Sequence, residues 1–300
     1  MSTLQRLTDQ NLIKPPRWLP GNVQYETIMG SVAYGVSSDT SDVDIYGWAI
    51  PPRDDIFPHL RGEIPGFGEP SGRFEQFQEH HVKDRSALAG HGRTYDLTIF
   101  GIVKFFSLAM DNNPNIIDSL FTPTTCVLHC TRVGTVVREN RRLFLHKGAW
   151  SKFKGYAYSQ MHKIAIKQPR GKRAELVAEH GYDTKFGYHV VRLIGEVEQI
   201  LTDGDIDLQR DRETLKAIRR GEWTHERLRA WFAEKELQLE KIHAESTLRA
   251  SPDESRIKAL LLDCLEEHYG SLEGCLVNPD RATLALRNIQ AELDRVKDLL

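Results

Sequence analysis

Residues 29–50 read MGSVAYGVSSDTSDVDIYGWAI, and the rest of the chain can be arranged around them. The apolar and aromatic run from Val43 to Ile50 predicts a β-strand, which the two following prolines end. Side chains two apart on a strand point to the same face, so we expect Asp42 and Asp44 to project together. Two carboxylates this close repel each other unless a cation lies between them, and Mg²⁺ prefers such oxygen ligands.

A Gly-Ser pair precedes this strand. Gly30 and Ser31 follow a second predicted strand over residues 23–29. Such a turn can direct backbone N–H groups and a hydroxyl at phosphate oxygens. A phosphate-binding turn beside a carboxylate pair indicates transfer of a phosphorus-containing group.

A third acid lies further along the chain. Asp96 stands in TYDLTIF, residues 94–100, a run that predicts another strand. Metal-dependent nucleotidyl transfer commonly uses a third carboxylate to activate the attacking hydroxyl, and Asp96 fits this role if its strand neighbours that of Asp44. The alternative is a solvated aspartate at a strand edge. Glu75 and Glu79, in a possible strand over residues 74–79, are the substitutes if Asp96 points away.

Composition sets wide bounds on the function. The chain has 300 residues, enough for two domains or subdomains, and a net charge of −2, so any nucleic-acid surface must be local. Its four cysteines suggest neither a zinc set nor a disulfide framework and agree with reduced thiols. No apolar span or signal segment is present, so we expect a soluble, cytoplasmic protein without membrane contact. The oligomeric state stays open.

The second half of the chain is predicted to be mostly helical, with a soft boundary near residues 121–128. At its end apolar residues recur at three-four spacing, a seam of about two heptads. We expect this seam to pack into the core rather than to form a coiled-coil dimer. Its members are Leu286, Ile289, Leu293, Val296 and Leu300.

A basic stretch, Arg141–Arg173, contains ten Lys and Arg residues and no Asp or Glu. On a helix over about residues 150–168, one face would present Lys152, Tyr156, Ser159, Lys163 and Lys167. A face of one charge sign attracts phosphate backbones, which predicts RNA binding here. An ordinary solvated face, which usually mixes both signs, is the alternative.

A second basic group lies in TKFGYHVVRLI. Lys185, His189 and Arg192 stand at i, i+4 and i+7, on one side of one predicted helix. Such a row suits a triphosphate, with Lys acting as a point charge and Arg as a fork. Alternatively, the three residues form the wet face of an amphipathic helix.

The motifs together resemble a known family. Met29-Gly30-Ser31, ten residues, then Asp42-Val43-Asp44-Ile45 is similar to the signature of the DNA polymerase β-like nucleotidyltransferase superfamily. Two further blocks, FFSLAMDNNPNIIDSLF (residues 105–121) and YDTKFGYHVVRLI (residues 182–194), resemble the RNA-ligase-associated predicted nucleotidyltransferases, the RlaP type.

This resemblance implies an α+β (α/β) fold, in which a mixed β-sheet with flanking helices is followed by a mostly α-helical region. We accordingly expect a catalytic domain over residues 1–125 and a helical domain over residues 126–300. The resemblance also implies Mg²⁺ (or Mn²⁺) on Asp42, Asp44 and Asp96. Contacts with the NTP would come from Gly30, Ser31, Ser41, Lys185, His189 and Arg192. One departure is Asp118, where the family pattern leads us to expect glutamate.

The expected activity is transfer of an NMP from an NTP to an acceptor hydroxyl, with release of pyrophosphate. An RNA end is the expected acceptor, in RNA repair. A protein hydroxyl, as in nucleotidylylating toxin–antitoxin enzymes, stays open. A non-catalytic nucleotide- or RNA-binding module is a third possibility, although such a binder has no use for two unpaired carboxylates facing a phosphate.

Overall fold

The computed structural model of the protein describes residues 1–37, 42–57, 73–166 and 171–271, together with residues 286, 289, 290 and 293. Five strands form one mixed sheet in the order β3-β4-β2-β1-β5. The strands are β1 (Val23–Ile28), β2 (Val43–Ala49), β3 (Gln76–Asp84), β4 (Arg93–Gly101) and β5 (Val127–Cys130). β2 and β4 run parallel, whereas the other neighbours are antiparallel.

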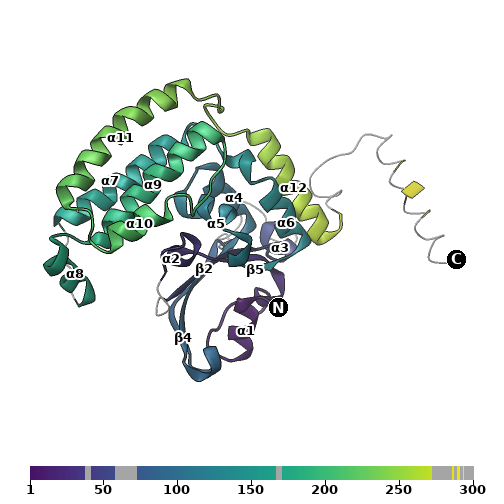
Figure 1. The fold of residues 1–300 in the computed structure, drawn as a ribbon. Helices are drawn as coiled ribbons and strands as arrows, with labels where there is room; N and C mark the ends of the chain where they lie inside the picture. Colours follow the sequence, from purple (N-terminus) through teal and green to yellow (C-terminus); the bar gives the residue numbers. More distant parts are fainter. Residues whose placement is uncertain are drawn as a thin grey trace, which may run out of the picture.

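Helices surround this sheet and make up most of the second half of the described chain (Figure 1). In the first half they are α1 (Thr3–Asp9), α2 (Gly30–Ala33), α3 (Arg53–Ile56), α4 (Ile102–Met110) and α5 (Pro114–Phe121). In the second half they are α6 (Arg132–Glu139), α7 (Ala149–Ile166), α8 (Lys172–His180), α9 (Thr184–Asp203), α10 (Arg212–Arg219), α11 (His225–Glu245) and α12 (Glu254–Tyr269). The predicted fold class, a mixed sheet with flanking helices followed by a helical region, is therefore confirmed.

One face of the sheet is closed by α1. Leu4 and Leu7 of this helix pack against Ile45 and Leu97 in a small apolar cluster. The helix is anchored at its N-terminus, because the buried carboxylate of Glu26 accepts hydrogen bonds from the backbone N–H groups of residues 3 and 4, at 2.5 and 3.0 Å. Of the predicted site residues, this face carries the substitute acid Glu79, which pairs with Leu97.

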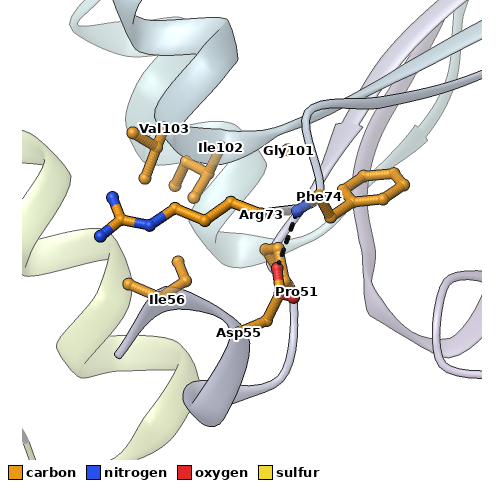
Figure 2. Close-up of a pocket in the computed structure, with 8 residues that line it drawn as sticks. All are labelled: Pro51, Asp55, Ile56, Arg73, Phe74, Gly101, Ile102 and Val103. Atoms are coloured by element: carbon orange, nitrogen blue, oxygen red, sulfur yellow. Dashed lines mark hydrogen bonds between the residues drawn. The ribbon is translucent and has the colours of Figure 1, made fainter. Parts of the chain in front are cut away.

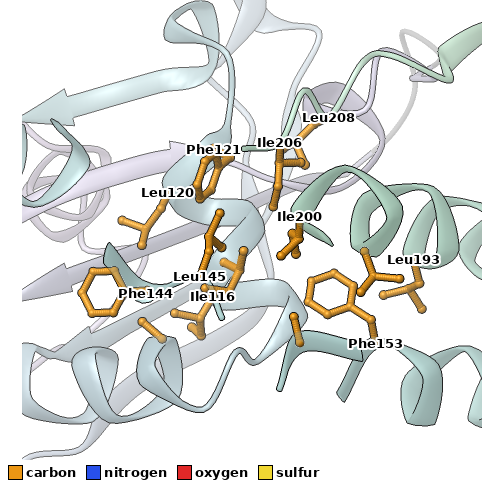
Figure 3. Close-up of a cluster of buried hydrophobic side chains, with 14 of the residues drawn as sticks. Ile116, Leu120, Phe121, Phe144, Leu145, Phe153, Leu193, Ile200, Ile206 and Leu208 are labelled. Carbon is orange, nitrogen blue, oxygen red and sulfur yellow. The ribbon is translucent and has the colours of Figure 1, made fainter. Parts of the chain in front are cut away.

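The opposite face packs against helices from both halves of the chain. Phe121 of α5, Phe153 of α7 and Ile200 of α9 meet in one continuous apolar core, shown in part in Figure 3. α9 is buried along most of its length, because α7, α10 and α11 all pack against it. Close packing of this kind holds the helices in fixed positions relative to the sheet.

The proposed division near residue 125 stays a prediction. β5 follows that residue in the sequence yet pairs with β1, so the second part of the chain contributes a strand to the sheet. The large core also includes residues from both sides of the division.

The C-terminal seam does not pack as expected. The described residues Leu286, Ile289 and Leu293 are helical but exposed, at 67%, 58% and 53%. Core packing is therefore wrong for these three residues, while Val296 and Leu300 lie outside the described residues.

Candidate active site

Asp44 and Asp96 lie side by side on the helical face of the sheet. The parallel register of β2 and β4 pairs Asp44 directly with Asp96, and paired residues of neighbouring strands project to the same face. Both side chains are half-buried, as is Tyr46 two residues further along β2. The tertiary structure thus brings together two acids that are more than fifty residues apart in the sequence. The catalytic role of Asp96 stays a prediction.

The Gly30 turn touches this acid pair. Gly30 has a φ of +66°, a conformation that residues with a Cβ rarely adopt. A Cβ at this position would also overlap Oδ2 of Asp44. The backbone N–H of Met29 donates to the carbonyl oxygen of Asp44 at 2.7 Å, which fixes the start of the turn against β2. Glycine is therefore required here by both conformation and space, and Ser31 follows directly on α2.

The charge state of Asp44 reflects its neighbours. Burial raises the pKa of this carboxyl, and repulsion from Asp96 and Asp42 raises it further. Lys185 and His80 oppose this shift. The raised pKa therefore means that the positive charge near Asp44 does not fully compensate its ionised form.

These acids suit a divalent cation. Asp44 and Asp96 offer adjacent hard oxygen donors, and a cation between them would relieve the repulsion that raises the pKa of Asp44. Asp42 lies exposed just before β2, and Ser41 lies outside the described residues. In the described parts of the chain no three His, Cys, Asp or Glu side chains are already grouped closely enough to hold a metal ion.

The two substitute acids lie elsewhere. Glu79 pairs with Leu97 across the β3–β4 ladder, so its side chain lies on the opposite face from Asp96. Glu75 forms an ion pair with Lys104 at 3.1 Å, near the far end of β4. Neither glutamate is placed beside Asp44.

α9 carries the three predicted cationic or donor residues, and of these Lys185 interacts with Asp44. Lys185 is exposed and contributes a favourable electrostatic interaction with Asp44. His189 is half-buried, and its ring lies against that of Tyr188 with 4.2 Å between centroids. Burial lowers the pKa of His189 well below the ordinary value, and the cations of Arg192, Lys185, Arg173 and Arg219 lower it further. This imidazole is therefore neutral near pH 7.

Arg192 has a different environment. Only 6% of the residue is exposed, and its guanidinium forms ion pairs with Asp118 and, at 3.0 Å, Glu196. It also donates to the hydroxyl of Tyr34 at 2.9 Å, and that hydroxyl in turn donates to Asp118 at 2.8 Å. The interpretation of this helix side as a wet face is wrong for Arg192. Its guanidinium already has two carboxylate partners, so it ties α9 to α5 and to the segment after Gly30.

The basic stretch is less uniformly positive in three dimensions than in the sequence. Lys152 forms an ion pair with Asp111 at 2.6 Å, and Lys154 forms ion pairs with Glu236 and Glu240 at 3.2 and 3.4 Å. Further pairs join Arg142 to Asp205 and, at 3.3 Å, Arg173 to Asp183. The expectation of a face without acids is therefore wrong, because other elements supply them.

Lys163 differs from these paired cations. Its Nζ lies 6.0 Å from the centre of the Phe186 ring, and no ion pair to it is present among the described residues. Lys167 lies outside the described residues. Among the lysines predicted to face RNA, Lys163 is therefore the one that has no acidic partner in the described part of the chain.

A small cavity lies at the other end of the paired strands. Gly101, Phe74 and Asp55 are among its lining residues, and the N–H of Phe74 donates to Oδ2 of Asp55 at 3.2 Å (Figure 2). Gly101 pairs with Ala49, five residues along β2 from Asp44. The cavity volume is about 40 Å³, which is too small for a nucleotide. We therefore do not assign it to the site.

Sequence reasoning missed several residues near these acids. His80 and His81 lie opposite Asp96 on β3, just beyond the possible strand predicted over residues 74–79, and only the unusual His-His pair signalled them. The Arg192–Glu196 pair was visible as an i, i+4 spacing, but its partners Tyr34 and Asp118 were not.

The chain resembles two known proteins. It is 28% identical over 149 residues to an uncharacterized 38.9 kDa protein of Enterobacteria phage T4, encoded in the nrdC-mobD intergenic region. That match covers 48% of this chain and 39% of the phage protein. A nucleotidyltransferase-like protein from Exiguobacterium sibiricum matches in structure with 10% identity and a TM-score of 0.29, covering 88% of this chain and 73% of that one.

The family comparison covers far more of the chain. The sequence model of RlaP, described as the RNA repair pathway DNA polymerase beta family, matches residues 1–263. Within the part of the chain that the structure describes, no helix is both long and apolar enough to span a membrane. Because the match to the family model spans most of the sequence, the chain belongs to the RlaP family.

Proposed function

We propose that the protein transfers an NMP from an NTP to an acceptor hydroxyl and releases pyrophosphate. The observation that carries this proposal is the direct pairing of Asp44 with Asp96 beside the positive-φ turn at Gly30. Two carboxylates next to a turn that has no side chain in the way suit a metal-bound triphosphate. Family membership supports the same chemistry.

The acids would hold Mg²⁺ or Mn²⁺. Asp44 and Asp96 supply adjacent oxygens, and the exposed Asp42 supplies a third acid from the start of β2. A bound divalent cation neutralises charge on the phosphates during transfer. The raised pKa of Asp44 supports this role, because the carboxylate lacks a sufficient cation of its own.

Other residues bind and orient the triphosphate in this proposal. Gly30 lies next to Asp44 and would bind the phosphates with Ser31, which follows it on α2. Ser41, outside the described residues, is assigned the same role. Lys185 adds a positive charge from α9, and the neutral His189 adds a hydrogen-bonding group one turn further along the helix. Arg192 acts indirectly, since it holds Tyr34 and therefore the segment that follows the turn.

The reaction itself is a displacement at the α-phosphorus. The acceptor hydroxyl loses its proton to Asp96 and forms a new bond to the α-phosphorus. The bond from the α-phosphorus to the bridging oxygen breaks, and pyrophosphate leaves with that oxygen. The position of Asp96 next to Asp44 on the neighbouring strand supports this role.

The acceptor we favour is an RNA end. The RNA repair description of the family supports this choice, and Lys163 offers a cation without an acidic partner among the described residues. A protein hydroxyl is the second candidate. A binding module without catalysis is the third, but it gives no reason for two adjacent carboxylates whose repulsion Lys185 and His80 offset only in part among the described residues.

The test is a transfer assay with all four α-labelled NTPs, Mg²⁺ or Mn²⁺, and either short RNA or total cellular protein. We expect label on RNA with the wild type and none with Asp44→Asn. The matched control is Asp54→Asn, an acid on α3 that is not part of the pair. Label on protein alone would select the second acceptor. No transfer by the wild type, or equal transfer by Asp44→Asn, would refute the enzyme.

A further inference from the structure

The edge strand β3 contains a bulge directly opposite Asp96. Glu79 pairs with Leu97 and Val82 pairs with Tyr95, so two residues of β3, His80 and His81, stand against one residue of β4. A bulge of this kind bends the strand and changes the direction of nearby side chains. The irregularity in this ladder therefore coincides with the third carboxylate of the proposed site.

Three nitrogen atoms of the bulge approach one oxygen of Asp96. The backbone N–H of His81 donates to Oδ1 at 2.7 Å. The Nδ1 atoms of His80 and His81 each lie 3.7 Å from the same Oδ1. Within the described residues, Oδ2 of Asp96 accepts no hydrogen bond. One oxygen is thus fixed by the protein, while the other is left for a ligand.

The bulge has an unfavourable backbone conformation. His81 has a φ of +56°, in the left-handed region that residues other than glycine seldom occupy. Its side chain is 77% exposed, so burial of the ring does not explain the conformation. The hydrogen bond from its N–H to Asp96 is the contact that this conformation provides. Strain of this kind is typical of functional sites.

We propose that the β3 bulge is a positioning device for Asp96, which holds Oδ1 through the N–H of His81 and leaves Oδ2 to face Asp44. In a regular ladder the same N–H would pair with the backbone of β4 or point away from it, and the carboxylate would rotate freely. The inference rests on the proposed function, because it assigns His81 to the same reaction as a positioning residue. The backbone N–H acts here, not the imidazole.

The test compares three changes at residue 81. Deletion of His81 restores regular pairing, and His81→Val keeps the length but disfavours positive φ through its branched side chain. His81→Gly keeps both the N–H and the conformation and is the matched control. We expect deletion to lower kcat on the order of 10²-fold with the KM for NTP nearly unchanged, because a misplaced group loses about that factor. His81→Val should lose less, and His81→Gly should stay within about 2-fold of wild type.

A combined variant tests whether the bulge acts through Asp96. The deletion should add nothing to Asp96→Asn, since residues that act as one unit are not additive. A further multiplicative loss would overturn the proposal, as would wild-type kcat in both the deletion and His81→Val. A loss in His81→Gly as large as in the deletion would also overturn it, because the imidazole would then be responsible. Thermal unfolding checks that each variant folds, and His81→Val decides if the deletion variant does not.

Binding of Mn²⁺, followed by electron paramagnetic resonance, separates this inference from the proposed function. If the wild type transfers no label, the function fails but the bulge is still tested. The deletion should weaken Mn²⁺ binding as much as Asp96→Asn does, while His81→Gly binds as the wild type. Mn²⁺ binding that is unchanged in the deletion would then overturn the inference.

Discussion

Two groups of acids lie near the helical face of the sheet, and they differ in what surrounds them. Asp44 and Asp96 are half-buried, and within the described residues Lys185 and His80 only partly offset the pKa rise of Asp44. Asp118 and Glu196 are buried almost completely, and both pair with Arg192. In the proposed function a bound cation compensates the first group, whereas Arg192 within the protein compensates the second.

The two groups should therefore differ in how their substitution affects the stability of the fold. A buried ion pair that loses one partner destabilises a protein, because the remaining charge has no water around it. Two adjacent half-buried carboxylates instead repel each other less when one of them is neutralised. Substitutions in the two groups should therefore have opposite effects on the stability of the fold.

The largest expected effect is on activity. Asp44→Asn should lower the transfer rate by at least on the order of 10³-fold, because a metal ligand is lost. The free energy of unfolding should stay equal or rise, since the charged form of this carboxyl is disfavoured by burial and by Asp96. Transfer assays and urea unfolding measure the two quantities. A clear loss of stability in this variant would contradict the comparison.

The second group should show the reverse pattern. Arg192→Met leaves Asp118 and Glu196 without their cation, which should cost about 3–5 kcal/mol of unfolding free energy. Urea unfolding measures this loss. Arg210→Met is a matched control, since its ion pair with Asp203 is exposed and should contribute at most about 1 kcal/mol. Equal losses in both variants would show that the buried network does not support the fold.

Lys185 lies on the same helix but faces the first group. Lys185→Met should raise the KM for NTP about 10-fold, because one charge-assisted contact to phosphate is lost. Its unfolding free energy should change by no more than about 0.5 kcal/mol, as is usual for exposed positions. Initial rates at varied NTP concentration measure the effect. An unchanged KM would remove Lys185 from the site.

His189 should make the free energy of unfolding depend on pH. Its pKa in the folded protein lies well below the ordinary value of about 6.5, so at intermediate pH the unfolded chain binds more protons. Stability from this group is present at neutral pH and is lost as pH falls below about 6.5, at up to about 1.4 kcal/mol per pH unit. His189→Gln should flatten this part of the curve. Urea unfolding between pH 5 and 8 measures the unfolding free energy of both proteins. The same pH dependence in the wild type and in His189→Gln would contradict this expectation.

The smallest expected effect concerns RNA. Lys163→Glu should weaken binding of single-stranded RNA and reduce the slope against salt concentration by about 0.7 or more, because phosphate contacts release counterions. Lys154→Glu is the matched control, since Lys154 already pairs with Glu236 and Glu240. Fluorescence titrations at several salt concentrations measure both slopes. Equal slopes for the two variants would place the RNA elsewhere.

Much of this architecture was readable from local patterns. Residues 43–50 and 94–100 were predicted as strands from their apolar and aromatic runs, and the structure has strands there. The mixed sheet and the helical second half followed from the family motifs. Local patterns also predicted Asp42, Asp44 and Asp96 as site residues, because the types and spacing of these residues reflect chemistry rather than packing.

The sequence failed where the partner of a charge comes from another element. Arg192 was predicted to bind a triphosphate or, alternatively, to lie on a solvated face, but its partners Asp118 and Tyr34 are supplied by α5 and by the segment after α2. The basic stretch looked free of acids because Asp111 and Glu236 lie outside it in the sequence. Helical spacing fixes which side of its own helix a residue occupies but not what packs there.

The sequence by itself determined the Gly-Ser and aspartate motif, the strand that carries Asp44 and the chemistry that two adjacent aspartates suit. Only the tertiary structure decided that Asp96 stands beside Asp44, because strand order and register depend on contacts across the whole sheet. It also decided that Arg192 supports the fold and that the bulge at His81 faces Asp96. Charges acquire their partners when distant segments pack together, and that pairing is not encoded in any one segment.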